Sequence, residues 1–233
     1  MGLAGMAMTY RVIATDYDGT LAHDGRVDES TLEALRVARD RGIRLIMVTG
    51  RELPDLFNTF EHAELFDRIV AENGALLYDP GTQSLRPLSI PAPPGLIEAL
   101  TRASLPISVG HSIIATVVPH EHQVLTAIRD LGLEWHVIFN KSSVMALPAD
   151  VTKATGLVPA LEALQLTARE TIGIGDAEND QAFLRMCGLS VAVDNALPSV
   201  KQMADLVLPY ARGAGVTKLI EMLLAGELDS QRP

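Results

Sequence analysis

Residues 11–20 read Arg11-Val12-Ile13-Ala14-Thr15-Asp16-Tyr17-Asp18-Gly19-Thr20 and place an apolar run directly before two carboxylates. The apolar run predicts a buried strand, and Gly19 permits the backbone to turn directly after it. Ligands of open α/β sheets bind at the carboxyl ends of strands. Alternate side chains of an extended segment share a face, so Asp16 and Asp18 can approach one small ligand together. The alternative is an ordinary turn, since Asp, Gly and Thr are all common turn residues.

A helix and two further strands are expected after this segment. Ser30 and Glu33 have capping-box spacing, which predicts that Ser30 caps a helix that follows it and ends at Gly42. Apolar runs at 43–48 and 68–71 predict the second and third strands. A strand, a helix and a strand within about 40 residues form a βαβ unit, which implies a parallel sheet with a right-handed crossover.

The C-terminal part of the chain repeats this pattern, whereas the middle differs from it. Strands are expected at 171–174, 190–193 and 206–208, with helices at 180–186 and 216–224. Proline and glycine punctuate the middle, where helices at 95–103 and 119–131 alternate with short strands at 107–109, 112–118, 134–140 and 143–147. We therefore expect a discontinuous α/β core, residues 9–79 and 151–226, that carries a small α+β insert at 80–150.

Polar residues follow other predicted strands as well. Thr49-Gly50-Arg51 could cradle a phosphate with a hydroxyl and free backbone N–H groups, or Thr49 could simply cap a helix. Lys153 precedes a helix and could hold a phosphoryl oxygen, although most isolated lysines are merely solvated. Residues 173–180 include Asp176, Glu178, Asn179 and Asp180. Four side chains with oxygen donors at the end of one strand indicate a site for a hard cation such as Mg²⁺.

Composition excludes several function classes. The 233 residues include 29 acidic and 19 basic side chains, a net charge of −10, which disfavours nucleic-acid binding. One cysteine rules out an intramolecular disulfide and suits a reducing cytoplasm. No run of about 18 apolar residues predicts a membrane span, and the first nine residues do not resemble a signal peptide. We expect a cytoplasmic monomer or homodimer whose partner is a small molecule.

Taken together, the motifs resemble the phosphatase branch of the haloacid dehalogenase (HAD) superfamily. Asp16-Tyr17-Asp18-Gly19-Thr20 resembles the first family motif, Thr49 the second, Lys153 the third and 175–180 the fourth. Further matches are Glu72-Asn73-Gly74, Asp194-Asn195-Ala196 and 201–205. The implied fold is a Rossmann-like parallel-sheet core with an inserted C2B-type cap. Within that class the chain resembles Cof-type sugar-phosphate phosphatases, and its compact cap resembles archaeal-type phosphoglycolate phosphatases.

The resemblance also implies a mechanism. Asp16 would attack phosphorus and form an aspartyl-phosphate, while Asp18 would protonate the leaving oxygen and then activate water. The substrate would be a small phosphorylated metabolite such as phosphoglycolate or a sugar phosphate. The implied Mg²⁺ ligands are Asp16, the backbone carbonyl of Asp18, Asp176 and Asp180, with support from Thr20 and Asn179, and the implied phosphate-binding residues are Thr49, Gly50 and Lys153.

The insert would select the substrate, and two other functions stay open. Polar insert residues that could face the site, or could equally be solvated surface residues, are Arg102, His111, Ser112, Asn140, Lys141 and Ser142. Related enzymes with this cap class move phosphate between sugar hydroxyls, so a phosphosugar mutase or phosphotransferase is one alternative. A non-catalytic regulatory module that retains the fold is the other, and the intact acidic residues and Lys153 count against it.

Overall fold

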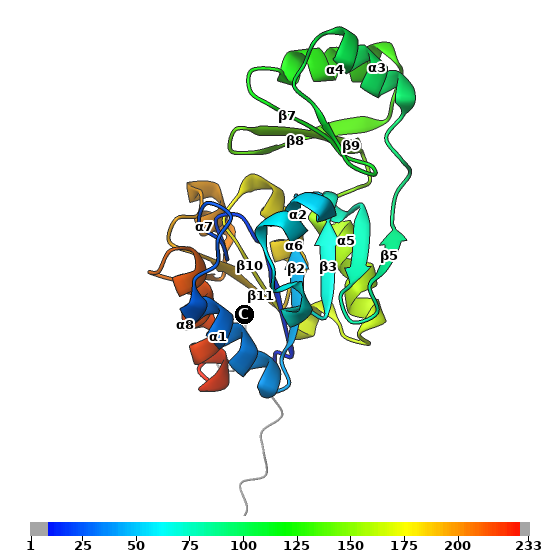
Figure 1. The fold of residues 1–233 in the computed structure, drawn as a ribbon. Helices are drawn as coiled ribbons and strands as arrows, with labels where there is room; N and C mark the ends of the chain where they lie inside the picture. The colour runs from blue at the N-terminus through cyan, green and yellow to red at the C-terminus, as the bar shows by residue number, and fades with distance from the viewer. Residues whose placement is uncertain (1–8, 229–233) are drawn as a thin grey trace, which may run out of the picture.

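The computed structural model describes residues 9–228, so the N-terminal segment considered above lies almost wholly outside the described part of the chain. Its main feature is an eight-stranded sheet in the order β12-β11-β10-β1-β2-β3-β4-β5 (Figure 1). In chain order these strands are β1 Val12–Thr15, β2 Arg44–Val48, β3 Arg68–Ala71, β4 Leu76–Asp79, β5 Ser84–Pro87, β10 Thr171–Gly175, β11 Leu189–Ala192 and β12 Leu206–Val207. The strands from β12 to β3 are parallel, which confirms the predicted parallel core.

The sheet reverses its winding at β1. This strand pairs with β10 on one side and with β2 on the other, and all four of its residues are buried. Strands of a parallel sheet are covered on both faces, which explains why β1, β2 and β10 read as nearly continuous apolar runs. A reversal of strand order leaves a crevice at the carboxyl ends of the neighbouring strands. The residues that follow β1, β2 and β10 therefore converge there.

Two pairs of helices cover the sheet. Helix α1 (Glu29–Asp40) packs against α8 (Arg212–Leu224), and α5 (Lys153–Ala163) packs against α6 (Gln181–Met186). Right-handed connections place these pairs on opposite faces of the sheet. Shorter elements complete the core: α2 Leu53–Thr59, α7 Pro198–Met203, and the 3₁₀ turns η1 Ala63–Leu65, η2 Glu72–Gly74, η3 Ala168–Glu170 and η4 Glu178–Asp180.

The helix cap predicted at Ser30 is wrong by two residues. Helix α1 begins at Glu29, and the extended backbone of Asp28 (ψ 148°) serves as its N-cap. Thr31 and Leu32 donate their backbone N–H groups to the Asp28 carbonyl. This start buries Thr31 and Leu32 together with Leu35 one turn later, so the packing face of the helix decides where it begins.

A second, four-stranded antiparallel sheet lies above the carboxyl ends of the core strands (Figure 1). Its order is β6-β7-β9-β8, with bounds β6 Ser108–Val109, β7 Ile114–Val117, β8 Trp135–Asn140 and β9 Ser143–Pro148. Helices α3 (Pro94–Arg102) and α4 (Glu121–Asp130) cover the face turned away from the core. The arrangement confirms the predicted fold class, a parallel core with a small α+β cap.

The edge of the large sheet runs further along the chain than the sequence predicted. Strand β4 turns back at residues 80–83 and pairs antiparallel with β5, so Ser84–Pro87 extends the core sheet although it lies past residue 79. Pro80 and Gly81 lie in the turn of this hairpin. The division into a core and a cap at residue 80 stays a prediction. Within residues 9–228, no helix is long and apolar enough to cross a bilayer.

A buried carboxylate joins the cap to the core. Glu72, at 2% exposure, accepts hydrogen bonds from the backbone N–H groups of His111 (2.8 Å), Ser112 (2.9 Å) and Ile113 (3.1 Å). Its own N–H donates to the carbonyl of Arg51 in the loop after β2. The turn that carries Glu72 therefore ties the start of β7 to the loop that begins at Thr49.

Replacement of Glu72 by Gln is expected to lower the free energy of unfolding. The amide keeps one acceptor oxygen but turns an N–H₂ group toward backbone donors, and each buried donor left without a partner costs about 1–3 kcal/mol. Urea unfolding of this variant should show that loss, whereas Glu98→Gln on the exposed side of α3 should change stability by less than about 0.5 kcal/mol. Equal stability of the two variants would show that Glu72 does not hold the cap.

Candidate active site

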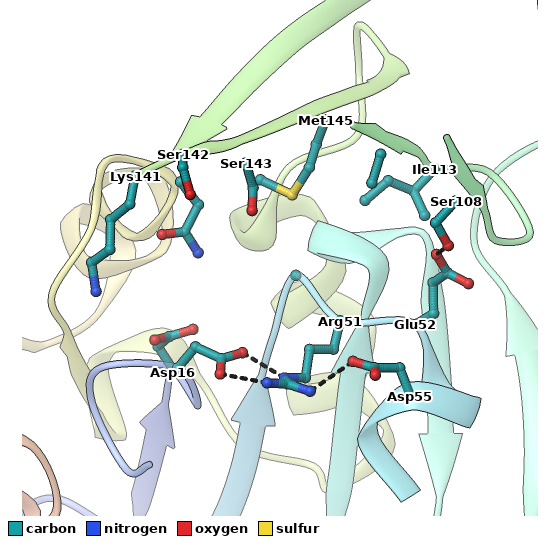
Figure 2. A pocket seen from close by; sticks show the side chains of 14 residues that line it. Asp16, Arg51, Glu52, Asp55, Ser108, Ile113, Lys141, Ser142, Ser143 and Met145 are labelled. Carbon is teal, nitrogen blue, oxygen red and sulfur yellow. Dashed lines mark hydrogen bonds and ion pairs between the residues drawn. The ribbon is translucent and has the colours of Figure 1, made fainter. Parts of the chain in front are cut away.

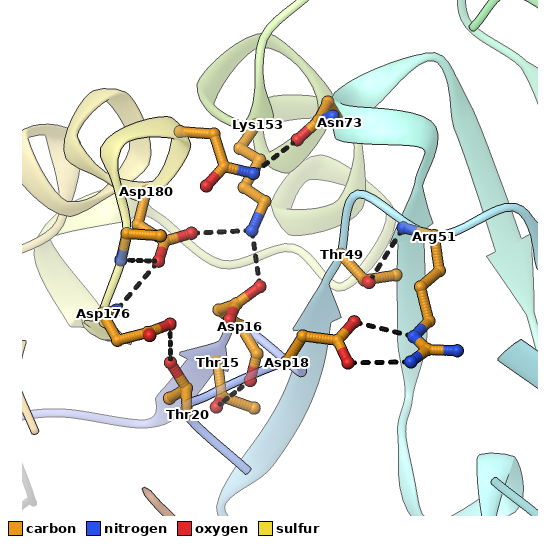
Figure 3. A network of polar contacts seen from close by, with 12 residues as sticks. Thr15, Asp16, Asp18, Thr20, Thr49, Arg51, Asn73, Lys153, Asp176 and Asp180 are labelled. Carbon is orange, nitrogen blue, oxygen red and sulfur yellow. Dashed lines mark hydrogen bonds and ion pairs between the residues drawn. The ribbon is translucent and has the colours of Figure 1, made fainter. Parts of the chain in front are cut away.

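Four charged side chains meet at the switch point of the sheet (Figure 3). Asp16 follows β1, Asp176 follows β10, Asp180 ends η4 and Lys153 begins α5. The Lys153 ammonium donates to Asp16 Oδ1 at 2.5 Å and to Asp180 Oδ1 at 2.6 Å. All four residues are at most 2% exposed. These residues, far apart in the sequence, form one buried charged cluster.

Local packing explains the position of Lys153. Thr152 is the N-cap of α5 and exchanges capping hydrogen bonds with Thr155. A Cβ atom on Gly74, whose φ is +116°, would lie 2.1 Å from the carbonyl oxygen of Thr152, and one on Gly156 would lie 2.4 Å from Gly74 Cα. Only glycine tolerates such contact. The close approach of η2 and α5 places the first residue of α5, Lys153, over the end of β1.

Burial and charge set the protonation of this cluster. Burial raises the pKa of Asp16 well above its ordinary value; the charge of Asp180 adds to the rise and that of Lys153 opposes it. Burial also raises the pKa of Asp176. Although burial opposes it, Asp16 and Asp180 raise the pKa of Lys153, which keeps its ammonium charged. The three carboxylates, when ionised, would carry more negative charge than Lys153 alone compensates, and the raised pKa values of Asp16 and Asp176 reflect the cost of that charge.

The donor set fits a divalent cation. One carboxylate oxygen from each of Asp16, Asp176 and Asp180 lies within 4.8 Å of the others. Asp16 Oδ2 is buried and has no hydrogen-bond partner among residues 9–228. Asp176 Oδ2 already attracts a cation, the ammonium of Lys141 at 2.9 Å. Clustered carboxylate oxygens with an unsatisfied acceptor are what Mg²⁺ binds.

The predicted metal ligands differ in the hydrogen bonds that their carboxylate oxygens already accept. Asp180 Oδ1 accepts from Lys153, and its Oδ2 accepts from the backbone N–H groups of Asp176 and Ala177, both at 2.9 Å. Asp180 thus orients the loop after β10. Among the carboxylate oxygens of Asp16, Asp176 and Asp180, Asp16 Oδ2 is the one without a hydrogen-bond partner in residues 9–228. Thr20 donates to Asp176 Oδ1 at 3.1 Å, in keeping with a supporting position.

Asp18 belongs to a neighbouring ion pair. Arg51 binds it in a bidentate manner, with Nε 2.7 Å from Oδ2 and NH2 2.8 Å from Oδ1. Arg51 also donates to Asp55 Oδ2 at 2.7 Å, and its backbone N–H donates to Thr49 Oγ1 at 3.1 Å. The Asp18 side chain is therefore turned to Arg51, and a metal contact through its backbone carbonyl stays a prediction. The sequence motif contained Arg51 but did not indicate this pairing.

An amide pair supports the cluster from the side of the cap. Asn179 Nδ2 donates to Asn73 Oδ1 at 2.8 Å, and Asn73 Nδ2 lies 3.1 Å from the sulfur of Met145 on β9. Asn195 Nδ2 donates to the carbonyl of Gly19 at 2.8 Å. Asn73 and Asn195 had been noted only as motif matches, because the sequence alone cannot show which loops touch.

A cavity of about 640 Å³ separates the cap from the core (Figure 2). Asp16 and the loop from Gly50 to Asp55 form its floor, and the β8–β9 hairpin forms much of its roof. Its full lining is Asp16, Asp18, Gly50, Arg51, Glu52, Asp55, Ser108, Ile113, Ala115, Asn140, Lys141, Ser142, Ser143 and Met145.

Three of the six cap residues proposed from the sequence line this cavity, namely Asn140, Lys141 and Ser142. The other three, Arg102, His111 and Ser112, are not part of its lining. Arg102 is exposed on α3, which covers the far face of the cap sheet. The backbones of His111 and Ser112 are bound to Glu72 instead. Polarity alone could not distinguish these positions, because only the folded cap shows which face meets the core.

Comparison with known proteins agrees with this geometry. A sequence profile of haloacid dehalogenase-like hydrolases matches residues 13–109 and 118–220. The chain is 29% identical over 221 residues to the phosphoglycolate phosphatase of Methanothermobacter thermautotrophicus, across 92% of this chain and 99% of that protein. It is also 29% identical over 225 residues to the phosphoglycolate phosphatase of Metallosphaera sedula, across 92% and 99% of the two chains.

Solved structures support the fold. A haloacid dehalogenase-like hydrolase from Bacteroides thetaiotaomicron superposes with a TM-score of 0.77 at 21% identity, across 92% of this chain and 99% of that one. A HAD subclass IIB sugar phosphatase gives a TM-score of 0.74 at 19% identity, across 91% and 98%. The profile match spans most of the sequence, and the resemblance predicted from the motifs is confirmed: the protein is an enzyme of the haloacid dehalogenase-like hydrolase family.

Proposed function

We propose that this enzyme is a Mg²⁺-dependent phosphomonoesterase that cleaves a small phosphorylated metabolite, such as phosphoglycolate or a sugar phosphate, through an aspartyl-phosphate. The observation that carries the proposal is the buried Asp16 at the floor of the cavity: Lys153 holds one of its oxygens, and the other has no hydrogen-bond partner within residues 9–228. Its relatives named phosphoglycolate phosphatase support the same reaction class.

In this proposal the free oxygen of Asp16 attacks phosphorus and the bond from phosphorus to the leaving oxygen breaks. Lys153 holds the other carboxylate oxygen of Asp16 in place and offsets charge that gathers on the phosphoryl group. Gly50 lines the cavity. Together with the buried Thr49 that precedes it, Gly50 would bind the remaining phosphoryl oxygens. Phosphoryl transfer depends mainly on such positioning and charge neutralisation.

Asp18 is proposed to move the protons. It lines the cavity beside Asp16, where it would give a proton to the departing oxygen and later take one from the water that cleaves the aspartyl-phosphate. Arg51 binds both oxygens of the Asp18 carboxylate in this structure, so the proposed role requires Asp18 to leave Arg51 and take up a proton before it meets the leaving oxygen.

Mg²⁺ would be held by Asp16, Asp176 and the backbone carbonyl of Asp18, with Asp180, Asn179 and Thr20 in support. When bound, it would neutralise charge on the phosphoryl oxygens and keep Asp16 ionised despite its burial. The cytoplasmic location and the oligomeric state stay predictions from the sequence.

Phosphate release from a panel of phosphorylated metabolites tests the proposal. We expect selective release in the presence of Mg²⁺ and its loss, by at least about 100-fold, after chelation and dialysis. Re-addition of Mg²⁺ should restore it, which separates metal removal from denaturation. Undiminished release from the chelated protein would refute the metal requirement, and release only when a sugar bisphosphate is supplied would favour the mutase alternative.

A further inference from the structure

The β8–β9 hairpin presents a lysine at a strained position. Asn140 and Ser143 are the last paired residues, so Lys141 and Ser142 make a two-residue turn. Lys141 has φ +54°, in the left-handed region where glycine is the usual choice. A strained non-glycine residue at the wall of a site is a reason to ask what its side chain does.

The Lys141 side chain points from the roof of the cavity toward the core (Figure 2). Its ammonium lies 2.9 Å from Asp176 Oδ2, so it binds the member of the carboxylate cluster that Lys153 does not contact. The lysine side chain is 52% exposed, whereas its partner carboxylate is fully buried. The ammonium can therefore exchange partners, since the lysine stem is flexible and half of it is in solvent.

The other charged side chains that line the cavity leave the Lys141 ammonium as the group best placed to bind an anion. Arg51, the other cation of the lining, is already bound by Asp18 and Asp55. Glu52, also in the lining, accepts a hydrogen bond from Ser108 at 2.5 Å and adds a further negative charge. An anionic group of a substrate would be repelled from this acidic floor. Beneath the hairpin it would meet an ammonium and the hydroxyls of Ser142 and Ser143.

We propose that Lys141 is a specificity-determining residue that binds a carboxylate on the substrate, so the preferred substrates are short phosphorylated carboxylic acids. The proposal rests on the phosphatase function above. A divalent cation held by Asp176 would repel the ammonium of Lys141, which would then pair with a substrate anion. The ammonium lies 2.9 Å from Asp176 Oδ2, and Asp176 shares one carboxylate cluster with Asp16, so an anion bound by Lys141 would lie close to the attacking group.

The test varies one charge on the protein and one on the substrate. Wild type and Lys141→Gln are compared with 2-phosphoglycolate and with 2-hydroxyethyl phosphate, which replaces the carboxylate by a neutral hydroxymethyl group. We expect Lys141→Gln to lower the preference in kcat/KM for phosphoglycolate about 10- to 100-fold, mainly through KM, because a charge-assisted hydrogen bond contributes that much. Lys141→Arg should restore part of the preference, since it keeps the charge.

Binding gives a second readout that does not depend on turnover. Calorimetry with 2-phosphoglycolate in the Asp16→Asn background, with and without Lys141→Gln, should show a loss of affinity of the same size. Lys218→Gln, which removes a charge from the surface of α8, should leave the preference unchanged.

Two outcomes would overturn the assignment of Lys141. One is an unchanged substrate preference in Lys141→Gln, and the other is a wild type that releases phosphate from neutral sugar phosphates but not from phosphorylated acids. Both leave the proposed phosphatase intact. Failure of the wild type to release phosphate from any compound would instead refute the proposed function itself.

Discussion

Asp16→Asn is expected to abolish phosphate release, with a fall in kcat of at least about 10⁴-fold, because the amide cannot act as the attacking nucleophile. The variant should nevertheless fold. Burial raises the pKa of Asp16, which means that its ionised form is costly in the folded state at neutral pH. The neutral amide removes this cost, and Lys153 keeps Asp180 as a partner at 2.6 Å. The melting temperature should therefore equal or exceed that of the wild type.

Asp24→Asn provides a matched control for this prediction. Asp24 lies in the same loop after β1, but its side chain is 91% exposed. Its φ of +49° also suits asparagine. Both kcat and stability should stay at the wild-type level. If Asp16→Asn kept a tenth or more of the wild-type kcat, direct attack by water would replace the covalent mechanism.

Lys153→Met is expected to damage both stability and activity. Methionine has similar length but leaves two buried carboxylates, Asp16 and Asp180, without the cation that binds them at 2.5 and 2.6 Å. Removal of one partner from a buried ion pair typically costs about 3–5 kcal/mol. Loss of the positive charge at the phosphoryl site should also lower kcat by about 100-fold or more.

The stability loss of Lys153→Met has a predicted pH dependence. The folded-state pKa of Asp16 is raised above its unfolded value, so protonation favours the folded state and stabilises it as pH falls through the raised pKa. A protonated carboxyl needs no cation. The difference in the free energy of unfolding between wild type and Lys153→Met should therefore be largest near neutral pH and become smaller toward acid pH.

Urea unfolding of the metal-free proteins across that range measures the deficit. Lys218→Met removes a surface ion pair with Glu221 and should cost less than about 1 kcal/mol at every pH. A deficit of similar size in both variants, or one that does not depend on pH, would show that Lys153 is not the compensating charge.

Much of the core could be predicted because its signals are local. The apolar runs at 12–15, 68–71 and 171–175 are strands within a residue or so of the predicted bounds, since buried parallel strands read as continuous hydrophobic segments. The carboxyl ends of such strands must meet at one edge. The sequence therefore predicted that Asp16, Lys153 and Asp176 lie close together.

The sequence could not predict side-chain contacts between loops that are far apart in the chain, either within the core or between the core and the cap. Arg51 pairs with Asp18, and Glu72 accepts three backbone N–H groups from residues 111–113, across long separations in the chain. The antiparallel edge formed by β4 and β5 was also missed, because its exposed outer strand has no apolar run. Which polar cap residues face the cavity likewise depends on tertiary packing.

The covalent step can be tested most directly by trapping the phosphoryl group. Wild-type enzyme with Mg²⁺ and a substrate from the panel would be quenched in acid at early times and digested, and its peptides analysed by mass spectrometry. The account predicts a phosphoryl group on Asp16 that appears before free phosphate and decays with turnover. Turnover at full rate with no phosphoryl group on Asp16 at any time, or with one on another residue, would contradict it.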